Sequence, residues 1–178
     1  VEKRRIKEYN QSDLINLKSY QKVIHLPSSD LDEKVIEVFK SWSGSLRMYD
    51  LDISTGPVVD FRNQESIQTK RKPGVVPLLW LHNVYPMNLS WPKQNGNRGK
   101  DKGQYILRSD TTSGRLVENK NYVLVRRFST KDDFKRLVAA PYFKQSKVKF
   151  PVIGIENHLN YIYHRTRELS MTEALGIA

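Results

Sequence analysis

The run Val75-Val76-Pro77-Leu78-Leu79-Trp80-Leu81 is a short apolar segment that follows a basic turn. An apolar run of this length is typical of a buried β-strand. Because Pro77 lacks an amide proton, we expect the strand to lie at a sheet edge or to carry a bulge. Further strands are predicted on both sides of it, over residues 23–26, 46–53, 58–61, 105–107, 122–128, 137–142 and 152–155, with 157–163 continuing the last.

Residues 30–42 contain apolar positions spaced so that they share one face of a helix, and we expect this face to be buried. These positions are Leu31, Val35, Val38, Phe39 and Trp42. Asp30 and Glu33 resemble a capping box at the start, and Gly44 is expected to end the helix.

A second capping box, Ser170-Met171-Thr172-Glu173, predicts a helix that has few residues left before Ala178. So short a helix is expected to bury no useful face, which predicts that the chain is a fragment of a longer protein. The predicted fold class is α+β and β-rich. It comprises a twisted antiparallel or mixed sheet, one well-defined helix near the N-terminus and a truncated helix at the C-terminus.

Composition narrows the class of protein. The chain has 178 residues, of which 38% are hydrophobic and 28% are charged, as in a globular protein of one domain or two small ones. It contains no apolar stretch long enough to span a membrane. The absence of cysteine excludes disulfides, thiolate zinc sites and a cysteine nucleophile.

The charge is strongly asymmetric. The formal net charge of +11 arises entirely after residue 60, because residues 1–60 carry 9 basic and 10 acidic side chains while residues 61–178 carry 21 and 9. Such an excess on one part of a chain predicts a basic face for a polyanion such as DNA, RNA or an anionic membrane surface.

Several catalytic motifs are missing from the sequence. It contains no P-loop, no dinucleotide-binding glycine motif in a strand-to-helix context, no GxSxG and no HExxH. It also lacks the Asn-Pro-Pro-Tyr motif that would bind a flipped adenine, since no two prolines are adjacent. His82, His158 and Glu156 leave open a metal-dependent nuclease as an alternative function.

Two basic segments have the chemistry of nucleic-acid contacts. The turn 69–74 contains Lys70, Arg71 and Lys72, whose charges suit phosphate groups. The polar loop 91–103 contains amide, arginine and lysine side chains between glycines. Amide and guanidinium groups can bind base edges in the major groove.

Several segments occur in an order that resembles a known family. They are Ser54-Thr55-Gly56-Pro57-Val58-Val59-Asp60-Phe61-Arg62, Val76-Pro77-Leu78-Leu79, Trp91-Pro92-Lys93, Tyr122-Val123-Leu124-Val125-Arg126-Arg127-Phe128-Ser129 and Glu156-Asn157-His158-Leu159-Asn160. This set, over roughly residues 23–178, resembles the C-terminal part of the TaqI-like adenine-specific (N6) DNA methyltransferases of bacterial restriction-modification systems.

The resemblance implies that catalysis and DNA recognition lie in separate domains. In that family an N-terminal domain binds S-adenosylmethionine and carries the catalytic motif, and the C-terminal domain recognises the DNA target. It implies a lead-in segment over 1–22, a target-recognition domain over 23–169 and the start of a truncated helix over 170–178. The chain alone is then expected to be inactive and to bind no cofactor. Its partners would be double-stranded DNA and the missing catalytic domain, in the bacterial cytoplasm and with no membrane.

Roles for individual residues follow from the resemblance and the local chemistry together. Phosphate contacts are expected from Lys70, Arg71, Lys72, Lys100 and Lys102. Base contacts are expected from Arg62, Asn95, Asn97 and Arg98. Trp91 and Pro92 are expected to brace the loop, which also carries the predicted interface residue Lys93. Arg126 and Arg127 are expected to support the basic face from a strand. Asn157, His158 and Asn160 are expected to be structural or to support the residues that contact DNA from near the cleft. An RNA-binding module is the other alternative.

Overall fold

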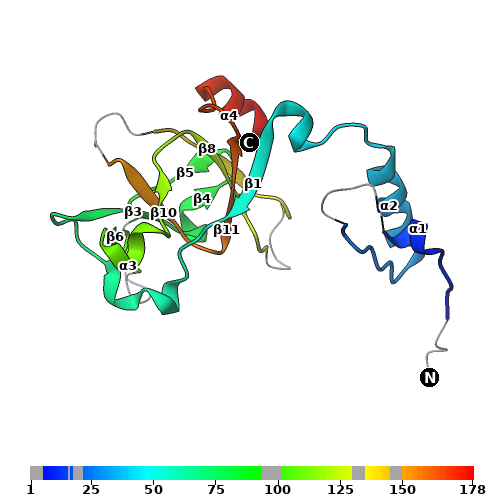
Figure 1. The fold of residues 1–178 in the computed structure, drawn as a ribbon, viewed down its shortest axis with the longest axis horizontal. Helices are drawn as coiled ribbons and strands as arrows, with labels where there is room; N and C mark the ends of the chain where they lie inside the picture. Colours follow the sequence, from blue (N-terminus) through cyan, green and yellow to red (C-terminus); the bar gives the residue numbers. More distant parts are fainter. Residues whose placement is uncertain (1–5, 16, 18–21, 94–101, 130–134, 145–149) are drawn as a thin grey trace. The chain divides into compact units, whose positions relative to one another are not determined.

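The computed structural model describes residues 6–15, 17, 22–93, 102–129, 135–144 and 150–178 (Figure 1). The chain divides into two compact units, Val1–Ser45 and Leu46–Ala178. The sequence analysis divides the chain by function, with boundaries after residues 22 and 169, and those boundaries stay predictions. Among the described residues, no helix is long and apolar enough to cross a bilayer.

The helix predicted near the N-terminus is confirmed as α2 (Asp30–Ser41). Its N-cap is Ser29, whose hydroxyl accepts a hydrogen bond from the Asp32 amide at 3.2 Å, so the cap lies one residue before the expected position. The helix ends before Trp42, which is extended, and Gly44 is therefore not its C-terminal stop.

The expected burial of the apolar face of α2 is wrong. No residue of α2 is buried, and Leu31 and Trp42 are 69% and 63% exposed. Among the described residues of the first unit, the other regular structure is the four-residue helix α1 (Gln11–Leu14) and one isolated pairing of Ile15 with Ile24. These elements are too small to cover a helix face, and the strand expected over 23–26 is reduced to that pairing.

Within the described part of the second unit, the strands form two main sheets and a hairpin. In spatial order, the antiparallel sheet contains β1 (Leu51–Thr55), β11 (Leu159–His164), β8 (Tyr122–Arg126) and β9 (Ala139–Tyr142). The mixed sheet contains β2 (Ile67–Gln68), β6 (Tyr105–Leu107), β3 (Val75–Leu79), β10 (Val152–Ile155) and β7 (Val117–Glu118). The hairpin pairs β4 (Val84–Tyr85) with β5 (Asn88–Leu89). The predicted fold class is confirmed.

The core lies in layers. Leu79 of β3 and Leu124 of β8 share one buried cluster, so the two sheets pack against each other. Because successive strand residues point to opposite faces, Val123 lies on the other face of β8 in a second cluster. Leu78 lies on the other face of β3 with Ile106 of β6 in a third. Strands β3 and β8 are thus buried on both faces.

The predicted C-terminal helix is confirmed as α4 (Met171–Ile177), drawn in red in Figure 1. The Ser170 hydroxyl accepts from the Glu173 amide, and the Glu173 carboxylate accepts from the Ser170 amide at 2.8 Å. The expectation that this helix buries no useful face is wrong. Ala174 is fully buried, and α4 packs against β8 and β9. Ala174, Ile177 and Ala178 pack into the second core cluster, so about two turns of helix are enough to cover part of a sheet face.

The expected edge position of Pro77 is also wrong. Strand β3 lies at the centre of the mixed sheet, between β6 and β10. Its parallel pairing with β10 involves Leu78 and Leu79 and so begins after the proline. Toward β6, the ladder continues through the Leu78 amide, which donates to the Gln104 carbonyl at 2.9 Å. Pro77 thus occupies a central position that requires no amide proton.

Other differences arise at short elements. Leu46 and Met48 lie in a 3₁₀ turn, Leu46–Tyr49, although Leu51 and Ile53 do lie in a strand. After the isolated pairing of Val58, a 3₁₀ turn replaces the expected strand. The residues after β10 form the separate strand β11. The remaining short elements are the 3₁₀ turns Asp60–Arg62, Gln64–Ser66 and Leu81–Asn83, and helix α3 (Asp110–Ser113).

Candidate nucleic-acid interface

A buried pair of amide side chains joins three loops at one end of β3 and β6. These strands are antiparallel, so the segment after β3 lies beside the segment before β6. Asn83 donates to Gln104 Oε1 at 3.1 Å and to the Ser90 carbonyl at 2.8 Å, while its own oxygen accepts from the Trp80 amide at 2.8 Å. Gln104 Oε1 also accepts from the Lys93 amide at 3.2 Å. Buried bonds of this kind fix the loops that carry them.

Two cationic side chains next to this network lie over the same aromatic ring. The Nζ of Lys93 is 5.2 Å from the centroid of Tyr85 and donates to its hydroxyl at 2.6 Å. The guanidinium of Arg126, at the end of β8, is 5.8 Å from the same centroid, and its Nε donates to the Val84 carbonyl at 2.8 Å. Both cations are thus positioned by uncharged partners.

A third cation, Lys102, lies over the indole of Trp80 at 4.6 Å from the centroid. The indole Nε1 donates to the Gly103 carbonyl at 2.8 Å, which holds the ring against the segment that carries Lys102. A carboxylate of Asp60 lies 4.0 Å from Lys102 Nζ, at the limit of an ion pair. Lys93, Lys102 and Arg126 are called the cation cluster below.

His82 lies among these charges and is neutral. Burial, together with the charges of the cation cluster, lowers the pKa of His82 from 6.5 to about 4. The hydrogen bonds agree with this. The oxygen of Gln104 accepts from Asn83 and Lys93, so its nitrogen faces His82 Nε2 at 3.3 Å. Because that nitrogen donates, His82 Nε2 must act as an acceptor and carries no proton.

This arrangement can bind an anion. Among the described residues, the carboxylate of Asp60 is the one acidic group that lies within ion-pair distance of the cation cluster. The hydrogen-bond partners of Lys93 and Arg126, the Tyr85 hydroxyl and the Val84 carbonyl, are neutral. A phosphate oxygen placed among them would gain charge-assisted hydrogen bonds and would offset the repulsion between like charges. The buried amides hold in place the described segments that carry Lys93 and His82.

A second group of predicted residues forms around Glu156, which is 1% exposed. Its carboxylate bonds Nδ1 of His158 and accepts from the His158 amide at 3.1 Å. Arg127 donates to the Asn157 carbonyl at 2.7 Å, and the buried Oδ1 of Asn157 has no partner among the described atoms. The buried carboxylate of Glu156 thus orients the imidazole of His158, which is exposed at the surface.

The structure separates the other predicted residues. Trp91 is half-buried and donates to the carbonyls of Leu78 and Gln104, both at 3.2 Å, which suits a bracing role. Arg62 is exposed, and its guanidinium lies over the ring of its neighbour Phe61. Arg71 and Lys72 line a pocket at the opposite end of β3, and Lys70 is exposed beside them. The predicted base-reading and phosphate residues Asn95, Asn97, Arg98 and Lys100 lie outside the described residues.

Tyr85, Trp80 and Gln104 were not identified from the sequence. Tyr85 lies in a two-residue strand with no periodicity, and Gln104 has no neighbours of like chemistry. For the nuclease alternative, the described residues contain no group of three or more metal-ligating side chains. His82 bonds Gln104, and His158 bonds Glu156, so the two histidines belong to different clusters.

Bacterial type II methyltransferases are the class of protein to which the chain is similar. M.BsuBI of Bacillus subtilis is 31% identical over 169 residues, which are 95% of this chain and 32% of that protein. M.PstI of Providencia stuartii is 25% identical over 154 residues, or 86% of this chain and 29% of that protein. No family model and no solved structure matches. The chain spans about a third of the length of these curated relatives, and the predicted relation to methyltransferases is confirmed.

Proposed function

We propose that this chain is the part of a TaqI-like adenine-N6 DNA methyltransferase that recognises the target sequence in duplex DNA. The similarity to type II methyltransferases and the net charge of +11 both support a DNA-contacting role. The observation that carries the proposal is the cation cluster, in which Lys93, Lys102 and Arg126 are held by neutral partners around a neutral histidine.

In this proposal the cation cluster binds backbone phosphates and fixes the orientation of the duplex. Phosphate contacts position a protein on DNA without reading the sequence. The base contacts would come from the residues that the sequence predicts for this role, among them Asn95, Asn97 and Arg98. Trp91 would hold the base of their loop through its bonds to Leu78 and Gln104.

Methyl transfer is proposed to take place outside this chain. S-adenosylmethionine supplies the methyl group in the family that the chain resembles, and the sequence here contains neither an Asn-Pro-Pro-Tyr motif nor a phosphate-binding glycine loop. We therefore assign no cofactor contact to these residues. The proposed partner is the catalytic domain that binds the cofactor and the extruded adenine.

Binding to a fluorescently labelled DNA duplex, measured by anisotropy over a range of salt concentrations, tests the proposal. The logarithm of affinity should fall linearly with the logarithm of salt, by about 0.9 per phosphate contacted. The double variant Lys93→Gln/Lys102→Gln should therefore reduce the slope by about 1.8. Lys144→Gln, which removes an exposed lysine elsewhere, is the matched control and should leave the slope unchanged.

Three results would contradict the proposal. A salt slope that is the same in the double variant and the wild type would remove the cation cluster from the interface. Stronger competition by single-stranded RNA than by duplex DNA would point to an RNA-binding module instead. Cleavage of plasmid DNA by the chain in the presence of magnesium would favour the nuclease alternative.

A further inference from the structure

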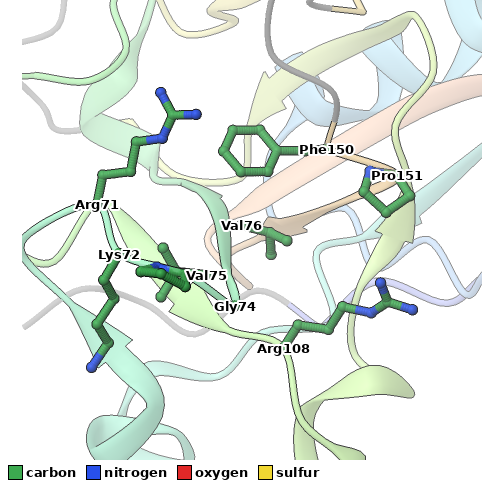
Figure 2. Close-up of a pocket in the computed structure, with 9 residues that line it drawn as sticks. Arg71, Lys72, Gly74, Val75, Val76, Arg108, Phe150 and Pro151 are labelled. Atoms are coloured by element: carbon green, nitrogen blue, oxygen red, sulfur yellow. The ribbon is translucent and has the colours of Figure 1, made fainter.

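A second basic site lies at the other end of β3 and β6. It is an open pocket of about 500 Å³, and Figure 2 shows the residues that line it. They are Arg71, Lys72, Pro73, Gly74, Val75, Val76, Arg108, Phe150 and Pro151. The lining contains three cationic side chains, one aromatic ring and no carboxylate.

Backbone contacts hold the walls of this pocket in place. The turn that carries Arg71 and Lys72 precedes β3, and the Arg108 amide, after β6, donates to the Gly74 carbonyl at 2.8 Å. Gly74 has a φ of +80°, which favours glycine at this close approach. The antiparallel pairing of β3 with β6 thus brings two charged segments to one place.

The aromatic wall is fixed from inside the protein. Asn119 is 3% exposed; its side chain donates to the Phe150 carbonyl at 2.8 Å, and its amide donates to the Pro151 carbonyl at 3.0 Å. Tyr142 in turn donates to the side-chain oxygen of Asn119 at 2.8 Å. Phe150 also packs against the third core cluster, so the ring is a fixed surface and not a loose side chain.

The two arginines are placed differently from the lysine. The guanidinium of Arg71 lies 5.5 Å from the centroid of the Phe150 ring, and Figure 2 shows it extending alongside that ring. Figure 2 shows the side chain of Arg108 on the opposite side of the view from Arg71, below Pro151, and Lys72 extending away from the aromatic wall. Within the described residues, no carboxylate forms an ion pair with any of the three. Their charges are therefore available to a ligand.

We propose that this pocket binds a single nucleotide, with its phosphate held by the basic side chains that line the pocket, chiefly Arg71 and Arg108, and its base against the apolar wall of Phe150 and Pro151. Guanidinium groups match phosphate oxygens with paired hydrogen bonds, and flat aromatic rings stack on bases of any sequence. A bare phosphate would leave the apolar wall of Phe150 and Pro151 unused, and an apolar ligand would leave the arginines unpaired. The pocket volume also lies within the range of small-molecule sites.

This site goes beyond the proposed function, because it takes an unpaired nucleotide while the cation cluster takes the backbone of a duplex. The two sites share no residue and can be tested separately. A failure of duplex binding would leave the nucleotide site unaffected. A failure of nucleotide binding would leave the role of the cation cluster unaffected.

Titration of the isotope-labelled chain with deoxyadenosine monophosphate, followed by NMR, tests the inference. Chemical-shift changes should centre on the amides around Gly74, Arg108 and Phe150. Inorganic phosphate and deoxyadenosine, titrated in the same way, should each bind about tenfold more weakly than the nucleotide, since each provides half of the contacts.

Variants distinguish the parts of the pocket. Arg71→Gln and Arg108→Gln should each weaken nucleotide binding about tenfold, and Lys72→Gln should have a smaller effect because its side chain extends away. Phe150→Leu should weaken the nucleotide but not inorganic phosphate. Lys144→Gln, which removes an exposed lysine that is assigned to neither site, is the control and should leave nucleotide binding unchanged.

Several results would overturn the proposal. Equal affinity for inorganic phosphate and the nucleotide would reduce the pocket to a general anion site. Equal affinity for the nucleoside would remove the role of the arginines. Unchanged binding in Arg71→Gln, an exposed position whose replacement does not disturb the core, would place the nucleotide elsewhere.

Discussion

Replacing Asn83 by alanine should destabilise the second unit by about 3 kcal/mol. The change removes three hydrogen bonds, to the Trp80 amide, the Ser90 carbonyl and Gln104 Oε1. Each bond contributes about 1 kcal/mol net, and a buried donor left without an acceptor costs about 1–3 kcal/mol. Gln104 keeps its bond from the Lys93 amide, so most of the loss falls on Trp80 and Ser90.

Urea unfolding followed by tryptophan fluorescence measures this loss. With a slope of about 2 kcal/mol per molar urea, the midpoint should fall by about 1.5 M. Hydrogen exchange of the Trp80 amide should also become faster, because that amide loses its acceptor. Asn88→Ala removes an exposed amide from the neighbouring hairpin and should change the stability by less than about 0.5 kcal/mol.

A midpoint that falls no more in Asn83→Ala than in Asn88→Ala would contradict this prediction. Unchanged hydrogen exchange of the Trp80 amide would also contradict it, because the amide network would then not be what holds the three loops. A large loss of stability with unchanged duplex binding would separate the amide network from the cation cluster it is argued to support.

Two further predictions concern a proton and a glycine. NMR titration should give His82 a pKa of about 4, which should rise only slightly in Lys102→Gln because burial is the larger cause. Since the folded pKa lies below the ordinary 6.5, the stability present above pH 6.5 should decline as the pH falls toward 4, and titration of the wild-type His82 at 6.5 would contradict this. Gly56→Ala should lower the free energy of unfolding in urea by about 3 kcal/mol, because its Cβ would lie 2.6 Å from the Ile155 carbonyl oxygen. Gly114→Ala is the control and should be neutral or slightly stabilising, since Gly114 has open space around it and a helical backbone; equal effects of the two changes would contradict the steric explanation.

Long, strongly patterned segments were predictable from the sequence, and short ones were not. Helix α2 and strands β3 and β8 carry enough apolar residues to show a period or a continuous run. Two-residue strands such as β4 and β7 are too short to show a period. The partner of β7 also lies far along the chain, in β10. The central position of Pro77 depends on where β10 begins to pair, and the run 75–81 does not contain that information.

The candidate site was predictable in its chemistry but not in its assembly. Lys93, Lys102 and Arg126 stood out as cations in a basic region. Their meeting around His82 depends on the pairing of β3 with β6 and on the contact of Arg126 with Val84. Contacts between residues far apart in the sequence cannot be predicted from the spacing of neighbouring residues. Arg108 was missed for the same reason, because its partner Gly74 lies 34 positions earlier in the numbering.

The antiparallel pair β3–β6 sets the distance between the two basic sites. Gly74 and Trp80 mark its ends, and six residues of extended chain at about 3.3 Å each set a span of about 20 Å. Phosphates along one strand of DNA rise by about 3.4 Å each, so a strand that reached both ends would touch them about six nucleotides apart. Since both members of the pair are hydrogen-bonded within the sheet, this interval is a fixed property of the scaffold. Inserting two residues into each strand would lengthen the interval by about two nucleotides.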